Sequence, residues 1–434
     1  MSRKNNISRR DFMKLSSGAI VGGTLSTLGQ PVFAEESSSV KAVANSSKLL
    51  SRSDVLNIAR NHIATFIADD DDMARSSLLC GSDFVSLFDF DDQVLAYAVP
   101  LIESGKEAGF ATVSAVTDGY SCYHTVFDAA ALNVLRKVSQ NDGCTLRFIP
   151  PMTYIVESAG AEKIGYEQII FGEPITMRSI SVNTETAQSF IREVRLKANN
   201  QAKNSANVEV QPRAYAEAYA LKRYFVNRFV PVFDNKGNDN ASDDVIHYGG
   251  NQSWYGAGSV AEDNGCGPTA AANITYYLDK QSLLAKTGLY PYTNINKSTF
   301  VSHMTTMYSY CAPSIIGDFN LAEWVMDVAD YAADRGVYVN YHTCNASASE
   351  LVFRQIVKEG LEKDSPVATL NLSYGWTVNG STLGWHWMTI TRFMRSYSDV
   401  RQVKVSTWGR AMYIDFDVLC LQTKNSGGGL CYFD

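Results

Sequence analysis

The period of the apolar positions changes along the first half of this chain. Over residues 53–66 apolar side chains recur every three or four residues, which predicts an amphipathic helix. Over 84–127 they alternate or run together between polar turns, which predicts several short strands. The helical period returns over 129–138 and 184–196. We therefore expect a small α+β domain over residues 51–196.

In the second half, helical patterns come first and strand patterns follow. The expected helices cover 214–229, a segment that starts near Cys266, 298–310, 321–335, and a segment that follows a capping-box spacing of Ser347 and Glu350 and ends near residue 362. The expected strands cover 337–341, 367–372, 384–393, 400–408 and 411–416. The polar turn at 396–399 predicts an antiparallel hairpin between two of these strands. The fold class expected for residues 214–434 is α+β, with a helical part ahead of an antiparallel β part.

Two polar segments separate these parts. Residues 35–50 form a Ser-rich linker, and residues 197–213 form a second linker that is rich in Asn, Ala and Lys. Exposed polar linkers are where proteases cut, so 197–213 is the expected processing site of a zymogen. The acidic run 69–72 lacks the alternating ligand positions of a calcium loop, and a solvated turn is expected there.

The first 34 residues have the order of an export signal. Arg9 and Arg10 precede an apolar stretch over 15–28, and Val32-Phe33-Ala34 offers a small-residue cleavage site. The apolar stretch is short and Gly-rich for a membrane span. We therefore expect a twin-arginine signal peptide over 1–34, an exported, bacterial protein, and no stable membrane span after cleavage.

The composition of the chain argues against several classes of function. The chain has 434 residues, a formal net charge of −7 and no long basic block, which argues against nucleic acid as the main partner. Its eight cysteines form no CxxC pair or close Cys/His cluster, so a structural zinc site is not expected. No cofactor is implied. The disulfide pairing cannot be read from the spacing.

One cysteine lies where a nucleophile would be expected. Cys266 stands between Gly265 and Gly267, and Pro268 and a helical pattern follow at once. At a helix N-terminus, unpaired N–H groups and the helix dipole favour a thiolate. The flanking glycines would let a substrate carbonyl approach the sulfur. A structural or disulfide-bonded cysteine is the alternative.

His386 is the best candidate for the base. It lies on an expected strand between Trp385 and Trp387, whose rings could shield a thiolate–imidazolium pair from water. A packed strand histidine is the alternative interpretation. Among the other histidines, His342 is the more credible rival, whereas His303 is expected on a helix surface.

Two segments carry a resemblance to known families. The segment SLFDFDDQVLAYAVPLIESGKEAGFATVSA, residues 86–115, resembles the inhibitory prodomain of streptopain-type cysteine peptidases. Gly265-Cys266-Gly267-Pro268, the later His386, and Val405-Ser406-Thr407-Trp408-Gly409 resemble papain-like peptidases, above all the secreted relatives of the bacteriocin-processing, double-glycine-leader type. The resemblance implies a papain-like domain over 214–434 behind a prodomain.

The resemblance also implies roles for further residues. In the family, an Asn orients the histidine and a Trp covers that contact, which here correspond to Ser406 and Trp408. Because serine replaces the Asn, Asp399 is an alternative orienting residue and Asp415 a weaker one. The family's oxyanion donor is a Gln upstream of the cysteine, for which Gln252 is the candidate, although it lies farther from Cys266 than in papain.

These features together predict an exported cysteine endopeptidase made as a zymogen, with a protein or peptide substrate and its own prodomain as partners. Two alternatives remain open. One is a papain-like amide hydrolase that acts on cell-wall peptides rather than on proteins. The other is a catalytically inactive surface binding protein, which the Ser406 replacement favours. The sequence gives neither the substrate nor the oligomeric state.

Overall fold

A computed structural model describes residues 48–68, 70, 77–160, 164–205, 215–222, 229–235, 245–256, 258–311, 320–372, 376–377 and 385–434. The expected signal peptide at 1–34 and most of the linker at 35–50 lie outside these residues. Within the described ranges, no helix combines the length and the apolar character needed to span a membrane.

The helices begin at capping residues that the sequence supplies. Ser51 precedes the first one, and its hydroxyl accepts a hydrogen bond from the Asp54 N–H while the Asp54 carboxylate accepts from the Ser51 N–H. The described helices are α2 (Arg52–His62) with its π-helical continuation η1 (Ile63–Ile67), α3 (Ala129–Ser139), α4 (Thr184–Ser205), the 3-10 turn η2 (Gln252–Tyr255), α5 (Val260–Asn264), α6 (Cys266–Lys280), α7 (Lys297–Cys311), α8 (Leu321–Asp334), α9 (Glu350–Glu362) and α10 (Phe416–Ser426).

The strands fall into an N-terminal and a C-terminal set. The first set comprises β1 (Leu79–Cys80), β2 (Val85–Phe88), β3 (Val94–Glu103), β4 (Lys106–Ser114), β5 (Cys122–Val126), β6 (Cys144–Ile149), β7 (Thr153–Ala159), β8 (Ile164–Ile170) and β9 (Thr176–Val182). The second comprises β10 (Tyr215–Ala220), β11 (Pro231–Phe233), β12 (Ile246–Tyr248), β13 (Tyr341–Asn345), β14 (Val367–Leu372), β15 (Trp376–Thr377), β16 (Trp385–Ser396), β17 (Arg401–Thr407), β18 (Arg410–Asp415) and β19 (Gly429–Phe433).

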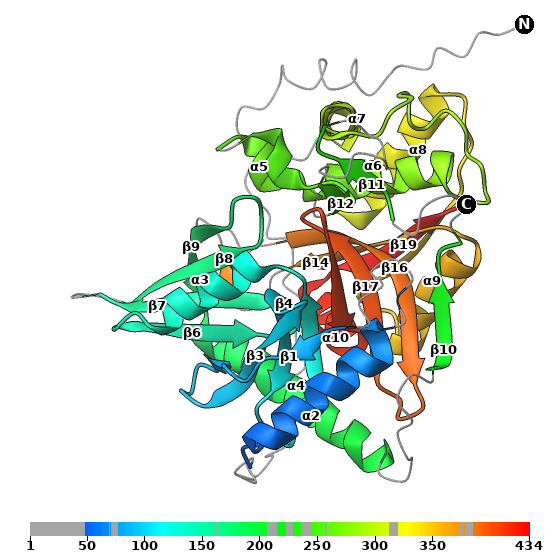
Figure 1. Cartoon of the computed structure of the whole chain (residues 1–434). Helices are drawn as coiled ribbons and strands as arrows, with labels where there is room; N and C mark the ends of the chain where they lie inside the picture. The colour runs from blue at the N-terminus through cyan, green and yellow to red at the C-terminus, as the bar shows by residue number, and fades with distance from the viewer. Residues whose placement is uncertain are drawn as a thin grey trace, which may run out of the picture. The chain divides into compact units, whose positions relative to one another are not determined.

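All described strands except β11 and β12 join one large mixed sheet (Figure 1). In the N-terminal region (residues 48–205), the order of neighbouring strands is β5, β4, β3, β2, β6, β7, β8 and β9. Among these pairs, only β2–β6 is parallel. In the C-terminal region (residues 215–434), the order of neighbouring strands is β13, β19, β14, β16, β17 and β18. The two regions meet where β18 pairs with β5 and where β15 pairs with β9. The α+β class is therefore confirmed.

Most N-terminal elements follow the pattern that predicted them. The helix expected over 53–66 is α2 with η1, and the expected strands over 84–127 appear as β2 to β5. Four strands, β6 to β9, were not predicted. In β8 and β9 only one residue of seven is buried, so these two strands carry little apolar alternation. Helix α4 continues to Ser205, so the first part of the expected linker at 197–213 is helical.

The helix expected over 214–229 is wrong where the structure describes it. Residues Tyr215–Ala220 form strand β10, which pairs antiparallel with the distant strand β16. Its alternating Tyr215, Glu217 and Tyr219 are half-buried, whereas the three intervening alanines are exposed. Alanine favours a helix locally, but pairing with a partner far along the chain decides the conformation here.

The C-terminal strands follow their prediction closely. Strands β16 and β17 form the expected antiparallel hairpin around the turn at 396–399. The strand expected over 337–341 begins only at Tyr341, and α10 and β19 were not predicted. The cap of α9 is Ser349 rather than Ser347: the Ser349 hydroxyl accepts from the Val352 N–H, while Ser347 donates to Asn345.

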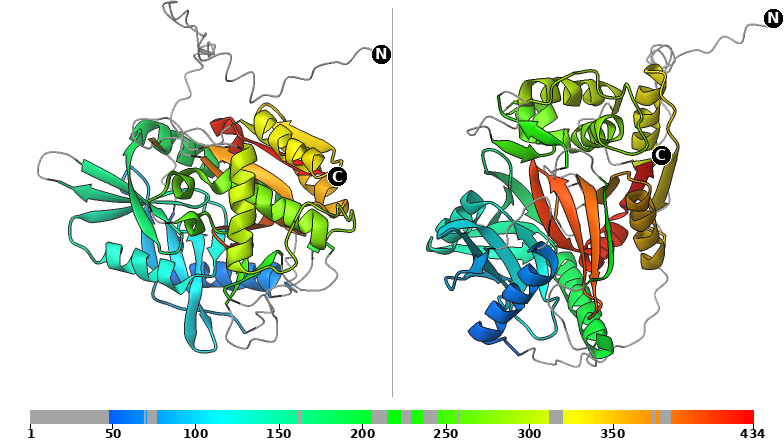
Figure 2. Two further views of the ribbon diagram at one scale, coloured as in Figure 1. Left: turned by 90° about the horizontal axis from the view of Figure 1, so that it is seen from above. Right: turned by 45° about the vertical axis from the view of Figure 1, so that its right-hand side comes forward.

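Helix α6 is the most buried helix near the sheet. Thirteen of its residues, from Cys266 to Leu278, are buried, and it packs between α7 and strand β16. Both views of Figure 2 place β16 and β17, in orange, beside the blue-to-cyan N-terminal region on one side, with the yellow and gold helices on the other. Cys266 at the start of α6 and His386 near the start of β16 line one cleft.

Candidate active site

Cys266 is the first residue of α6, as its position after the Gly-flanked turn predicted. The short helix α5 ends at Asn264, and Gly265 is the N-cap of α6. A Cβ on Gly265 would lie 2.3 Å from the Ala261 carbonyl oxygen, so only glycine fits between the two helices. The cysteine is 4% exposed, and the helix N-terminus directs its unpaired N–H groups toward this end.

His386 lies near the start of β16 and has two close neighbours from the end of β17. Its Nε2 is 2.5 Å from the hydroxyl of Thr407, and its ring stacks on the indole of Trp408 with centroids 4.2 Å apart. The next residue, Trp387, stacks on Trp324 of α8. Strand β16 is thereby fixed against the helices on one side and against the β17–β18 hairpin on the other.

A single small cleft collects the residues that the sequence had singled out. Cys266, His386, Gln252, Ser406 and Trp408 all line it. The cleft is also lined by residues from the segment before η2, from α6, from β16 and from the end of β17. These residues are Gly250, Thr269, Ala270, Asn273, Trp387, Thr389 and Thr407. Residues separated by more than 150 positions in the sequence therefore converge on one site.

Trp408 is held over His386 by an unusual turn. Thr407 and Arg410 pair across β17 and β18, so Trp408 and Gly409 form a two-residue hairpin loop. Both have positive φ, 48° and 71°, as a type I′ turn requires. Asn and Gly favour this conformation, whereas a tryptophan there costs on the order of 1 kcal/mol. Strain of this kind indicates a role for the side chain.

Ser406 does not orient His386, contrary to the expectation from the family pattern. Its hydroxyl donates to the Tyr248 carbonyl at 2.6 Å. Successive residues of a strand point to opposite faces, so Thr407 and not Ser406 reaches the imidazole. Ser406 instead fixes the segment before Gln252. Gly249 in that segment has φ +85°, and a Cβ there would lie 2.3 Å from the Ser406 hydroxyl oxygen.

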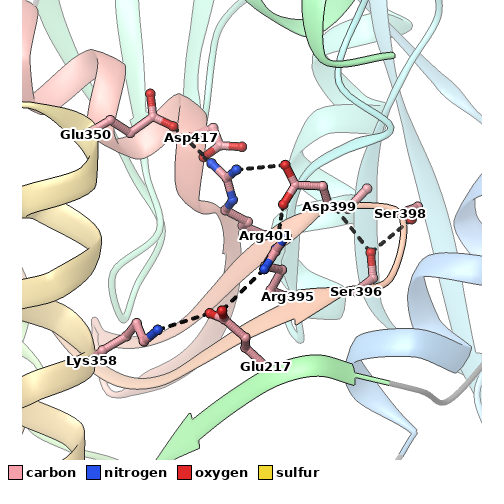
Figure 3. Close-up of polar contacts among 10 residues, drawn as sticks. Glu217, Glu350, Lys358, Arg395, Ser396, Ser398, Asp399, Arg401 and Asp417 are labelled. Carbon is pink, nitrogen blue, oxygen red and sulfur yellow. Dashed lines mark hydrogen bonds and ion pairs between the residues drawn. The ribbon is translucent and has the colours of Figure 1, made fainter. Parts of the chain in front are cut away.

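Asp399 is also ruled out as the orienting residue in this structure. It lies in the turn after β16, at the opposite end of that strand from His386. Its carboxylate binds Arg395 at 2.5 Å and Arg401 at 2.8 Å (Figure 3). The weaker alternative, Asp415, caps α10 by accepting from the backbone N–H groups of Asp417 and Val418.

Gln252 lies in the cleft with Cys266, and the chain between them folds back as the sequence required. The Gln252 side-chain amide donates to the Glu262 carbonyl of α5 at 2.8 Å. The same segment is tied to the Trp408 turn, because Gly409 N–H donates to the Gly250 carbonyl at 3.0 Å. A carboxamide nitrogen carries two donors, so its second N–H can serve a bound oxyanion.

The other histidines do not share this cleft. His342 stacks on Tyr432 and contacts Asp434, far along the sheet on β13. His303 is fully buried rather than on a helix surface, and its Nε2 contacts the Thr275 hydroxyl. His247 lies behind the Trp408 turn, where its Nε2 is 2.8 Å from Asp234. His386 therefore has no rival as the base.

The surroundings of His386 determine its charge. Burial lowers the pKa of its imidazole to about 3, so the ring is neutral at pH 7. The residue as a whole is half-buried. In the neutral tautomer whose Nε2–H donates to the Thr407 hydroxyl, the other ring nitrogen is a proton acceptor. This is the state that a general base needs before reaction.

Part of the N-terminal region borders the cleft. The Phe171 ring meets Trp408 edge-on, with centroids 6.3 Å apart, and the Phe171 carbonyl accepts from Arg410. The Glu173 N–H donates to the hydroxyl of Ser253, the residue after Gln252. Arg178 forms an ion pair with Asp263, three residues before Cys266. The segment from Phe171 to Arg178 thus contacts residues on both sides of the site.

Thr407 is the site residue that sequence reasoning missed. The correspondence with the family's orienting Asn placed this role on Ser406. No local signal in the sequence shows which of the two neighbouring residues faces His386, because that depends on the register of β17. None of the eight cysteines forms a disulfide, and all of them lie in described parts of the chain. Within those parts, no group of three or more His, Cys, Asp or Glu side chains could hold a metal ion.

Comparison with known families and with characterised proteins yields no match to this chain. The assignment of a function therefore depends on the geometry of the site.

Proposed function

We propose that this protein is an exported cysteine endopeptidase with a papain-like arrangement of its catalytic groups. The observation that carries the proposal is the convergence of Cys266, His386, Gln252 and Trp408 on one cleft. A thiol at a helix N-terminus, a neutral imidazole and an amide donor are the three parts that acyl transfer through a thiol requires. No metal or cofactor has a role in this chemistry.

The proposed reaction uses His386 twice. Its Nε2–H donates to Thr407, and the other ring nitrogen accepts the Cys266 proton as the sulfur attacks the amide carbonyl. The Cys266 N–H and the Gln252 amide hold the oxyanion. When the C–N bond breaks, the imidazolium protonates the leaving amine, and a thioester remains on Cys266. Water then attacks the thioester with His386 as base, which releases the acid and restores the thiol.

The protein is made as a zymogen under this proposal. The N-terminal region corresponds to the streptopain-type prodomain, and its segment from Phe171 to Arg178 contacts Trp408, Ser253 and Asp263 around the cleft. A polypeptide substrate would have to displace this segment to reach Cys266. Regulation then depends on how readily these contacts break.

Intact-mass measurement with an irreversible, peptide-based thiol inhibitor tests the proposal. The wild type is compared with Cys266→Ala and with Cys311→Ala, which removes another buried thiol from the same helical part. We expect one stoichiometric adduct on the wild type and on Cys311→Ala, and none on Cys266→Ala. Absence of the adduct from the wild type, even after proteolytic cutting between Ser205 and Tyr215, would refute the proposal.

Substrate assays separate the endopeptidase from the alternatives. The unlabelled wild type is incubated in parallel with denatured protein and with purified peptidoglycan, and Cys266→Ala serves as the inactive control. Cleavage of the first alone supports an endopeptidase, and release of peptides from the second alone supports a cell-wall amide hydrolase. The inactive binding protein was favoured by serine at position 406, but Thr407 supplies a hydroxyl to His386. That alternative now requires an unreactive Cys266.

A further inference from the structure

The interface between the two regions consists of buried strand pairing, as in the core of a single domain. Strand β5 pairs with β18 through Val126–Met412, Thr125–Tyr413 and His124–Ile414, and all six residues are buried. Separation would turn β5 and β18 into open strand edges with unpaired backbone N–H and C=O groups. From Ser47 onward the chain forms one compact unit.

A buried ion pair reinforces this face. Asp70 of the N-terminal region is 2.8 Å from the Lys404 ammonium of β17, and the two side chains are 2% and 1% exposed. Tyr413 also bonds Asp70, and Arg392 lies 3.7 Å away. Burial alone would raise the pKa of Asp70, but the interactions with Lys404, Tyr413 and Arg392 together outweigh burial and lower it. The expectation of a solvated acidic turn at 69–72 is therefore wrong for Asp70.

Apolar packing crosses the same face. Tyr413 and Met394 of the C-terminal region lie in one core cluster with Val55, Phe66 and Leu101 of the N-terminal region. Helix α4 adds two polar contacts, from Lys197 to Glu350 of α9 and from Glu193 to Asn425 of α10. Neither region can leave without exposing part of a shared core.

Strands β17 and β18, which contact the N-terminal region, also hold residues of the cleft in place. Lys404 precedes Thr407 by three residues on β17, and Arg410 of β18 forms an ion pair with Asp128 of the N-terminal region at 2.8 Å. The Lys404 ammonium lies over the Tyr248 ring, and the Tyr248 carbonyl accepts from Ser406. The Trp408 turn therefore depends on a hairpin that the N-terminal region holds in place.

We infer that the N-terminal region stays bound to the C-terminal region after the chain between Ser205 and Tyr215 is cut. The active enzyme is then a complex of two chains rather than a free C-terminal domain. That the complex is an active enzyme rests on the proposed function. Activation requires movement of the Phe171–Arg178 segment away from the cleft and leaves the β5–β18 face intact.

A recognition sequence for a site-specific protease, inserted between Ser205 and Tyr215, tests the inference on the chain without its expected export signal. After complete cutting, we expect both fragments in one size-exclusion peak at about 1 μM, without denaturant. Two separate peaks under these conditions would overturn the inference. Intact mass of each peak identifies the fragments.

Substitution of the buried lysine measures the contribution of the anchor. Lys404→Met removes the charge at similar side-chain volume and leaves Asp70 buried, which should weaken the cut complex about 100-fold or more. Lys197→Met is the matched control, because its partly exposed pair with Glu350 should change the affinity less than about threefold. Thermal unfolding of both uncut variants verifies that they fold. Equal, small effects of the two substitutions would contradict the anchoring role of Lys404.

Labelling of Cys266 in the same samples separates this inference from the proposed function. One peak with a Cys266 adduct supports both. One peak without an adduct keeps the inference, and the peptidase is refuted if the adduct is also absent from the cut Arg178→Ala variant, whose segment has lost its ion pair with Asp263. Separate peaks, with an adduct on the freed C-terminal fragment, refute the inference and keep the peptidase.

Discussion

The indole of Trp408 lies nearly parallel to the imidazole of His386, with ring centroids 4.2 Å apart and an interplanar angle of 15°. The indole can take this position because Trp408 adopts a positive φ in the two-residue turn between β17 and β18. One face of the imidazole is thereby closed to water. The stack contributes to the burial that lowers the pKa of His386 to about 3.

Replacement of Trp408 by asparagine should separate stability from activity. Asparagine favours the type I′ turn, so the free energy of unfolding should fall by less than about 1 kcal/mol despite the lost stacking. Water would reach the imidazole, and its pKa would rise toward 6.5. The acid limb of kcat/KM should move to higher pH, so that kcat/KM falls by less than about twofold at pH 7 and about tenfold at pH 5.5.

The control for this prediction is Trp408→Phe, which keeps an aromatic ring over His386 and keeps the strained turn. It should retain the acid limb of the wild type. An unchanged pH profile in Trp408→Asn would contradict the shielding role.

The hydroxyl that orients His386 can be identified by paired substitutions. Thr407→Val keeps the shape of the side chain but removes the contact to Nε2, and kcat should fall about 10- to 100-fold with KM almost unchanged. Thr407→Ser should restore most of kcat. Ser406→Ala should lower the unfolding free energy by about 1–3 kcal/mol, because the Tyr248 carbonyl loses its donor, and should change kcat little. The reverse pattern would return the role to Ser406.

Asp399 offers a further test of the orienting group. Asp399→Asn weakens its bonds to Arg395 and Arg401 but touches nothing in the cleft. We expect kcat/KM within about twofold of the wild type and a loss of stability of at most about 1 kcal/mol, since these pairs are partly exposed. A loss of activity without a loss of stability would show that Asp399 acts on His386.

The oxyanion role of Gln252 predicts a loss in the transition state. Gln252→Ala should lower kcat about 10²- to 10³-fold, because one preorganised donor is removed, while KM changes little. The affinity of a peptide aldehyde, whose adduct with Cys266 carries an oxyanion, should fall by a similar factor. Gln355→Ala, the same substitution at an exposed position of α9, is the control and should leave both quantities within about threefold. If only KM rises, Gln252 binds substrate instead.

Local signals in the sequence explain which parts of this fold were predictable. The start of α6 at Cys266 was predicted because glycine, proline and helical periodicity act over a few residues. Strand β10 was missed because its conformation depends on pairing with β16, far along the chain. The orienting residue was misplaced by one position for a similar reason. Whether Ser406 or Thr407 faces His386 is decided by the register of β17 against its neighbours, which short motifs do not encode.

Buried histidines should make the protein sensitive to acid. Burial lowers the pKa of His62, His303 and His386 to about 3 and that of His124 to about 4. Between pH 6.5 and pH 4 these groups stay neutral in the folded chain, whereas the unfolded chain takes up their protons. The unfolded state therefore binds more protons, and the free energy of unfolding falls as the pH is lowered through this range.

Each such histidine should add about 1.4 kcal/mol per pH unit to the slope of stability against pH below 6. Urea unfolding of the wild type between pH 7 and pH 4.5 measures this slope. His303→Leu should lower this slope by about 1.4 kcal/mol per pH unit, the contribution of one proton. The substitution removes a titrating group from the core around Thr275. Met304→Ala, in the same buried helix face, should destabilise the protein equally at every pH and leave the slope unchanged. A His303→Leu slope equal to that of the wild type would mean that this imidazole is already protonated in the folded chain, or exposed enough to titrate normally.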